Sequence, residues 1–128
     1  MISKIKEFLH QLSAKLIALS VKNQWLLQRL TAILLVPLAI WLGVFFHYSL
    51  AASFQEARVW LMRPLNLGCL FVFLGIVVVH SHLGLKVIIE DYIADQQLQE
   101  KLIFASLWGF GLLGVSVVGA VIILFFRV

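Results

Sequence analysis

The stretch LNLGCLFVFLGIVVVHSHLGLKVII, residues 65–89, decides the fold of this chain. A helix needs about 20 residues to cross the hydrocarbon core of a bilayer, so these 25 residues are long enough to span it. Two further apolar segments of sufficient length occupy residues 30–50 and 102–126. The sequence therefore predicts an all-α membrane protein with three transmembrane helices.

The composition excludes a soluble domain. Hydrophobic residues make up 62% of the 128 residues and charged residues only 12%, and the mean hydropathy is +1.04. The net charge of +4 does not indicate nucleic-acid binding, because the positive residues flank the apolar segments. The single Cys69 has no cysteine for an internal disulfide and no partner at metal-site spacing, so we interpret it as a helix-packing residue.

Residues 2–24 predict an amphipathic helix ahead of the first span. Lysines are interleaved with apolar residues at spacings of three and four, which is typical of a helix that lies on the membrane or docks on a partner. The apolar positions are Ile2, Ile5, Phe8, Leu9, Leu12, Leu16 and Ile17. The segment lacks the long apolar core and cleavage site of a signal peptide.

The distribution of positive charge predicts the orientation in the membrane. Seven Lys and Arg residues precede the first span or flank the connection between the second and third, against three on the other side. The positive-inside rule then places the N-terminus in the cytoplasm and the C-terminus outside. Asp91 and Tyr92 follow the second span and are expected on the inner side.

His80 lies in the middle of the second span, where an unpartnered histidine is costly. At about 100° per residue, the step from His80 to Asp91 returns to within about 20° of the same helix face and rises about 16 Å. That face carries His80, Gly84, Val87 and Asp91. A neutral imidazole beside a missing side chain suits axial ligation of haem. The alternative is a packing histidine that hydrogen-bonds to a neighbouring helix.

Four further residues have two interpretations each. His82 points about 200° away from His80, which favours a satisfied polar residue over a second ligand of the same iron. Asp91 and Tyr92 suit a quinone headgroup, with a phenol donor and an acid that relays protons, or they form an ordinary interfacial helix end. Arg29 lies at the inner end of the first span, on the same side of the membrane as Asp91. It could pair with a haem carboxylate or simply set the topology.

The other segments carry no catalytic pattern. Residues 51–64 form a short outer connection that ends at Arg63-Pro64, a start signal for the next helix. The third span is rich in small residues, which indicates helix packing. The sequence has no phosphate loop, no cysteine pair and no nucleophile beside a base, so any catalysis needs a cofactor or another subunit.

Two motifs resemble one family. The run His80-Ser-His-Leu-Gly84-Leu-Lys-Val-Ile-Ile-Glu-Asp91-Tyr92 resembles the H-x3-G-x6-D-Y pattern of the small D-type hydrophobic membrane anchor of succinate dehydrogenase. Gln28-Arg29-Leu30-Thr31-Ala32-Ile33 resembles that family's Arg-x-Thr-Ala element. With the size and the three spans, the resemblance covers nearly the whole chain, residues 1–128, as a single membrane-anchor domain.

The resemblance implies a role in respiratory complex II. His80 would be an axial ligand of haem b, Gly84 would give clearance, and Arg29 would pair with a haem propionate. Tyr92 would donate a hydrogen bond to ubiquinone, with Asp91 as support or proton relay. The implied partners are a flavoprotein, an iron–sulfur protein and the C-type cytochrome b anchor in a bacterial inner membrane.

Two rival interpretations come from different classes. A fumarate reductase anchor would use the same electron path in reverse. A haem-free structural or assembly protein would use His80 for packing, but that role gives no reason to place an acid and a phenol at the inner end of its face. A transporter subunit is disfavoured, because no polar face continues across the membrane.

Overall fold

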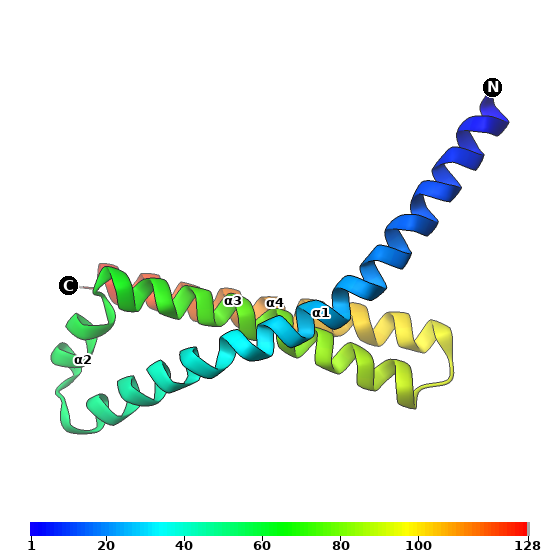
Figure 1. The fold of residues 1–128 in the computed structure, drawn as a ribbon. Helices are drawn as coiled ribbons and strands as arrows, with labels where there is room; N and C mark the ends of the chain where they lie inside the picture. The colour runs from blue at the N-terminus through cyan, green and yellow to red at the C-terminus, as the bar shows by residue number, and fades with distance from the viewer. Residues whose placement is uncertain (128) are drawn as a thin grey trace.

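The computed structural model describes residues 1–127, and the side chains of residues 16–22 and 125 lie outside that description. This part of the chain is all-α and contains no strand. Its four helices are α1 Ile2–Ala51, α2 Phe54–Leu61, α3 Pro64–Tyr92 and α4 Gln96–Phe126 (Figure 1). The predicted all-α class is confirmed.

Three helices are long and apolar enough to cross a membrane, at Asn23–Ala51, Pro64–Tyr92 and Gln96–Leu124. They confirm the three predicted spans, but the helices run past the predicted limits of 30–50, 65–89 and 102–126. The length of an apolar run shows how much of a helix lies in the membrane. The helix itself can extend into polar residues on either side of that run. At α4 the polar residues 96–101 are still helical, because Asp95 caps the helix by accepting from the Gln97 amide at 3.1 Å.

Helices α3 and α4 run antiparallel and side by side, and α1 crosses them diagonally (Figure 1). Small residues permit the close approach of α3 and α4: a Cβ on Gly114 would lie 3.1 Å from Cγ2 of Val78. The crossing of α1 with α3 brings residues near position 28 beside residues near position 84. The candidate functional site lies at this crossing.

The N-terminal helix is present but is continuous with the first span. Helix α1 runs unbroken over 50 residues, and its first part projects away from the other helices (Figure 1). No Gly or Pro lies between residues 2 and 30 to end it. The predicted apolar positions Leu16 and Ile17 fall among the side chains outside the description. Docking of this segment on a membrane or a partner stays a prediction.

The connection between the first two spans contains a short helix, α2, that we did not predict. Ser53 and Glu56 form a reciprocal cap: the Ser53 amide donates to Oε2 of Glu56 at 2.7 Å, and the Glu56 amide donates to Oγ of Ser53 at 3.3 Å. Hydrogen bonding to the Glu56 carboxyl from Ser53, first from its backbone amide and then from its side chain, lowers the pKa of that carboxyl below its ordinary value. The pattern Ser-x-x-Glu was the available signal.

An aromatic cluster holds α2 against α1. The Trp60 ring stacks with Trp41, Phe45 and Tyr48, at centroid distances of 6.2, 5.2 and 6.0 Å. Asn66, in the first turn of α3, donates to the Trp60 carbonyl at 2.8 Å and accepts from the Trp41 indole at 3.2 Å. The outer ends of α1, α2 and α3 are therefore tied together.

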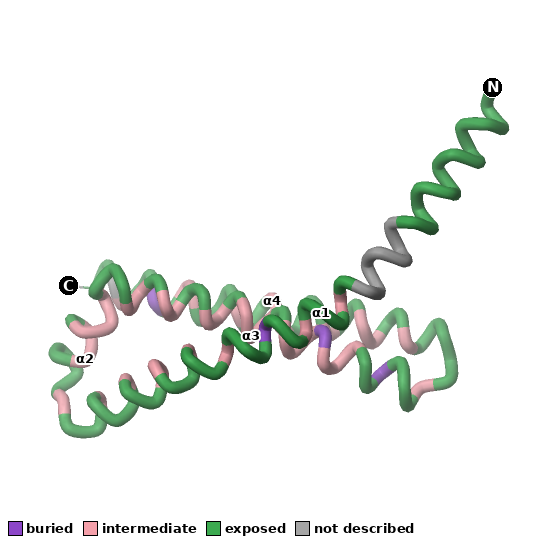
Figure 2. Tube along the Cα trace, in the orientation of Figure 1, coloured by how far each residue is buried: buried purple, intermediate pink, exposed green. Residues whose placement is uncertain are grey.

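Few side chains are buried within the chain itself. Among those described, the buried residues are Thr31, Leu83, Ile89 and Val121. Most of the surface of the long helices is exposed and apolar (Figure 2). Such faces are compatible with lipid or with other transmembrane helices.

Candidate functional site

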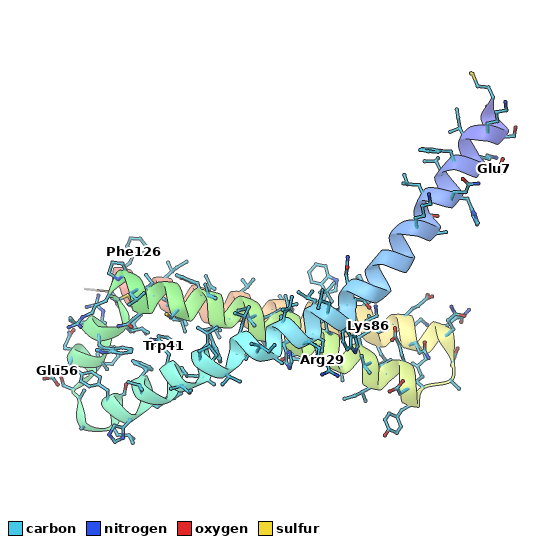
Figure 3. All side chains as sticks on the ribbon, in the orientation of Figure 1. Glu7, Arg29, Trp41, Glu56, Lys86 and Phe126 are labelled. Carbon is cyan, nitrogen blue, oxygen red and sulfur yellow. The ribbon has the colours of Figure 1, made fainter. Side chains whose placement is uncertain are left out.

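A groove of about 460 Å³ lies where α1 crosses α3. Helix α1 contributes one wall and α3 the other, and three of the predicted site residues, Arg29, His80 and Gly84, lie on these walls. The lining residues are Trp25, Gln28, Arg29, Ala32, His80, Gly84 and Val87. In Figure 3, Arg29 and Lys86 mark the crossing of the two helices. The first half of the predicted face of α3, from His80 through Gly84 to Val87, therefore opens onto one cavity.

His80 is tied to α1 by Thr31. The Thr31 hydroxyl lies 2.9 Å from Nδ1 of His80, and only 5% of Thr31 is exposed. The same hydroxyl lies 2.8 Å from the Leu27 carbonyl oxygen and 3.0 Å from that of Gln28. Nε2 of His80 makes no hydrogen bond to any side chain that the structure describes. One ring nitrogen is thus anchored and the other is not.

Gly84 and Gln28 face each other across the groove. A Cβ on Gly84 would lie 3.2 Å from Nε2 of Gln28, which is tighter than ordinary van der Waals contact. Oε1 of Gln28 is buried and has no hydrogen-bond partner among the described residues. Buried polar atoms are normally paired, so this amide is suited to a group that is not part of the chain.

Arg29 places a positive charge beside the groove. Its Cζ lies 4.9 Å from the centroid of the Trp25 ring, a cation–π contact that holds the guanidinium near the groove wall. No carboxylate of the described chain pairs with Arg29, whereas Lys86 lies 3.9 Å from Glu90 and donates to Oε1 of Gln24 at 2.8 Å. Arg29 is therefore the groove's available cation for an external anion.

Asp91 and Tyr92 are not part of the groove. They form the last turn of α3, beyond Val87, and both are exposed, Tyr92 to 85%. The structure thus separates the predicted site into a groove with Arg29, His80 and Gly84 and an exposed pair at the helix end.

His82 points away from the groove, as its helical position predicts. Its Nδ1 lies 2.9 Å from Oγ of Ser106 on α4. The Ser106 hydroxyl in turn lies 2.8 Å from the Ile103 carbonyl oxygen. His82 is therefore satisfied by a neighbouring helix of the same chain.

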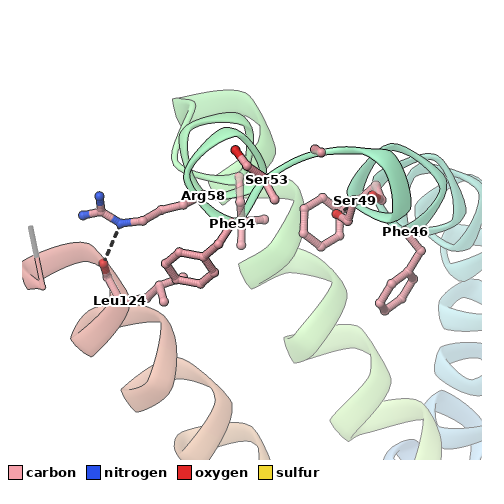
Figure 4. Close-up of a pocket in the computed structure, with 10 residues that line it drawn as sticks. Phe46, Ser49, Ser53, Phe54, Arg58 and Leu124 are labelled. Carbon is pink, nitrogen blue, oxygen red and sulfur yellow. Dashed lines mark hydrogen bonds between the residues drawn. The ribbon is translucent and has the colours of Figure 1, made fainter.

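A second cavity, of about 370 Å³, lies at the opposite end of the chain beneath α2 (Figure 4). Its walls are mainly apolar and include Phe45, Phe46, Phe54 and Leu124. Nε of Arg58 donates to the Leu124 carbonyl at 2.9 Å, so a side chain of α2 caps a carbonyl in the last turn of α4 (Figure 4). None of the predicted site residues lines this cavity.

The groove between α1 and α3 fits one side of a planar, anionic cofactor such as haem. It offers an imidazole with an unbonded nitrogen, a glycine that keeps the wall close to the backbone, and a guanidinium with no carboxylate partner among the described residues. The described residues contain no cluster of three or more His, Cys, Asp or Glu that could hold a free metal ion. Haem iron needs only axial ligands from protein, so one histidine per chain is sufficient.

The sequence reasoning missed two residues as site residues: Gln28, which lines the groove, and Thr31, which contacts the groove residue His80. Thr31 entered only as part of the Arg-x-Thr-Ala element, and Gln28 only as the residue before Arg29. The position of Gln28 was predictable, since residues 25, 28, 29 and 32 share one helix face. Which face of α3 meets that face depends on the crossing of the helices, and a single sequence does not specify it.

Three membrane-crossing helices, a small internal core and a one-sided groove define a multi-pass membrane subunit. The family model of succinate dehydrogenase/fumarate reductase transmembrane subunits matches residues 22–126. The chain belongs to this family. The resemblance inferred from the two sequence motifs is therefore confirmed.

The chain is similar to curated proteins from several Rickettsia species. The chain is 40% identical over 91 residues to the succinate dehydrogenase hydrophobic membrane anchor subunit of Rickettsia bellii, covering 69% of this chain and 70% of that one. Subunits of the same name from Rickettsia felis and Rickettsia conorii are 35% and 36% identical; the matches cover 63% and 67% of this chain and 68% and 69% of those proteins. No solved structure gives a significant match. The chain is thus of the membrane-anchor type.

Proposed function

We propose that this chain is the D-type membrane anchor of a succinate:quinone oxidoreductase and helps to bind haem b and ubiquinone. One observation carries the proposal: His80 and Gly84 of α3 line a single groove with Arg29 of α1, which is far from them in sequence. A packing histidine would not need a glycine and an unpaired arginine on the same walls. The name of the Rickettsia relatives supports succinate dehydrogenase over fumarate reductase.

His80 would supply an axial nitrogen to the haem iron from the α3 wall. Iron ligation requires a ring nitrogen with a free lone pair, and Nε2 of His80 makes no hydrogen bond to any described side chain. Gly84, one turn further along, would let the flat ring system approach the backbone, because a side chain there would meet Gln28. Bound haem would supply reversible one-electron transfer within the membrane.

Arg29 would hold a propionate of the haem. Its guanidinium has no carboxylate partner within the described chain, and an arginine–carboxylate pair at a partly dry site is stronger than one in water. The NH2 group of the nearby Gln28 side chain would be a second donor to the same carboxylate, because Gln28 lines the groove beside Arg29. The anionic edge of the cofactor would then lie at the α1 wall.

Tyr92 and Asp91 would form part of a quinone site at the inner membrane surface. The Tyr92 phenol would donate to a quinone carbonyl, and Asp91 would relay the protons that reduction consumes. Both side chains are exposed in the single chain, so the remaining walls would come from the C-type anchor and the iron–sulfur subunit. Electrons would arrive from that iron–sulfur subunit, which the flavoprotein reduces.

The orientation follows from the charges. The N-terminus of α1 and the connection between α3 and α4 would face the bacterial cytoplasm, and the C-terminus would face the periplasm. The groove would lie nearer the cytoplasmic end of the spans, because Arg29 is near the inner end of the first span, Asn23–Ala51, and Gly84 is in the inner part of the second, Pro64–Tyr92. The haem and quinone sites would then be close enough to exchange electrons.

The test is an optical spectrum of the complex purified through this chain. The reduced-minus-oxidised difference should show a b-type band that His80→Ala removes or shifts. His82→Ala is the matched control, since His82 lies two residues away and contacts Ser106 instead of the groove. A wild-type complex without haem, or a band that only His82→Ala removes, would contradict the assignment of His80.

A further inference from the structure

Thr31 is the one buried polar residue among the side chains that the structure describes. We infer that Thr31 is a positioning residue for His80. Its hydroxyl oxygen accepts a hydrogen bond from Nδ1–H of His80, and this orients Nε2 toward the haem iron. The inference rests on the proposed haem role of His80. It assigns a function to a residue outside the predicted site.

The hydrogen-bond geometry indicates which atom donates. A threonine hydroxyl has one proton, and two carbonyl oxygens of the preceding turn lie within reach of it, at 2.8 Å on Leu27 and 3.0 Å on Gln28. With that proton directed into the helix, the hydroxyl oxygen faces His80 as an acceptor. Nδ1 of His80, 2.9 Å away, then carries the ring proton. Nε2 is left as the nitrogen with a free lone pair.

The surroundings make this contact selective. Thr31 is 5% exposed, so water has little access to compete for the hydroxyl. Its β-branched side chain has few rotamers in a helix, and the contact to the preceding turn fixes one of them. A histidine that ligates a metal usually donates its other ring proton to such an acceptor, which fixes the tautomer and makes the ligand more basic.

The chain contains a matched pair on the other side of α3. His82 and Ser106 show the same relationship, with Nδ1 to Oγ at 2.9 Å and the hydroxyl 2.8 Å from a carbonyl of its own helix. Of the two histidines, only His80, the partner of Thr31, lines the groove. Ser106→Ala therefore removes an equivalent hydroxyl without touching the proposed ligand.

The experiment compares Thr31→Val, Thr31→Ser and Ser106→Ala in the whole complex. Valine keeps the shape and removes the acceptor, so haem affinity should fall about 10- to 100-fold, the usual effect of losing a partner of a metal ligand. The haem midpoint potential should rise, because a less basic ligand stabilises the oxidised iron less. Thr31→Ser and Ser106→Ala should keep both wild-type values. If Thr31→Val does not assemble, Thr31→Ala gives the same readouts without the hydroxyl.

The outcomes separate this inference from the proposed function. Wild-type potential and affinity in the hydroxyl-free variant, with His80→Ala still losing haem, would overturn the role of Thr31 alone. An equal shift in Ser106→Ala would overturn it too, because the effect would then not be specific to the ligand. No haem in the wild type, or haem unaffected by His80→Ala, would overturn the proposed function and this inference together.

Discussion

Nδ1 of His82 and Oγ of Ser106 lie 2.9 Å apart and join α3 to α4 within the membrane. We expect Ser106→Ala to destabilise the complex by about 0.6 kcal/mol, the average for a hydrogen bond between transmembrane helices. The b-type band should be unchanged, because this pair faces away from the groove. Thermal unfolding monitored with the haem spectrum checks both statements, and loss of the band would assign His82 a direct part in the site.

Gly84 should tolerate no large side chain. A Cβ there would already lie 3.2 Å from Nε2 of Gln28, so Gly84→Val would push into the groove. We expect the variant to assemble with much less haem per complex. Gly68→Val is the control, because a Cβ on Gly68 of the same helix meets nothing within 4 Å. Equal haem content in the two variants would show that clearance at Gly84 is not required.

Tyr92→Phe should slow quinone reduction and leave succinate oxidation by a soluble dye unchanged. The substitution removes only the phenol hydroxyl of an exposed side chain, so folding should not suffer. Losing one hydrogen bond of about 1 kcal/mol predicts a fall of about fivefold in quinone turnover. Tyr48→Phe, in the aromatic cluster at the other end of the spans, is the control. Wild-type quinone turnover in Tyr92→Phe would remove Tyr92 from the site.

The cap of α2 should weaken in acid. The hydrogen bonds from Ser53 lower the folded-state pKa of Glu56 below its ordinary 4.5. A lowered pKa means that the carboxylate stabilises the folded state above pH 4.5 and that this contribution is lost as the pH falls through the lower folded value. The protection of the α2 amides against hydrogen exchange, taken relative to the intrinsic rate at each pH, should therefore fall in acid.

Glu56→Gln is the control for this pH dependence. Glutamine can complete the same cap but does not titrate. The α2 amides of the variant should therefore not show the acid-induced loss of protection expected in the wild type. The same acid response in both proteins would exclude Glu56 as its source.

The apolar runs and the face from His80 to Val87 were predictable from sequence, because both depend on periodicities along one helix. The helix ends were less so: residues 96–101 are polar but remain helical behind the Asp95 cap. Helix α2 was missed because a connection of this length needs no helix, although Ser53 and Glu56 signal one. Hydropathy therefore predicts which residues lie in the membrane, whereas capping residues predict where a helix begins.

The partners of the site residues were not predictable. Placing Thr31 against His80, and Gln28 against Gly84, requires knowing how α1 crosses α3. Interhelical contacts depend on small differences in packing, and one sequence leaves the crossing open. A shared helix face was also not sufficient to predict a shared cavity. Asp91 lies on the same face of α3 as His80 but does not line the groove.

The small internal core has a consequence for how cells must supply this protein. Four described side chains are buried within the chain, so lipid and neighbouring subunits must cover most of its helices. Apolar faces alone do not fasten helices together in lipid. A copy made in excess of its neighbours would therefore remain loosely organised and open to membrane proteases. We expect its abundance to follow the synthesis of its assembly partners more closely than that of its own messenger RNA.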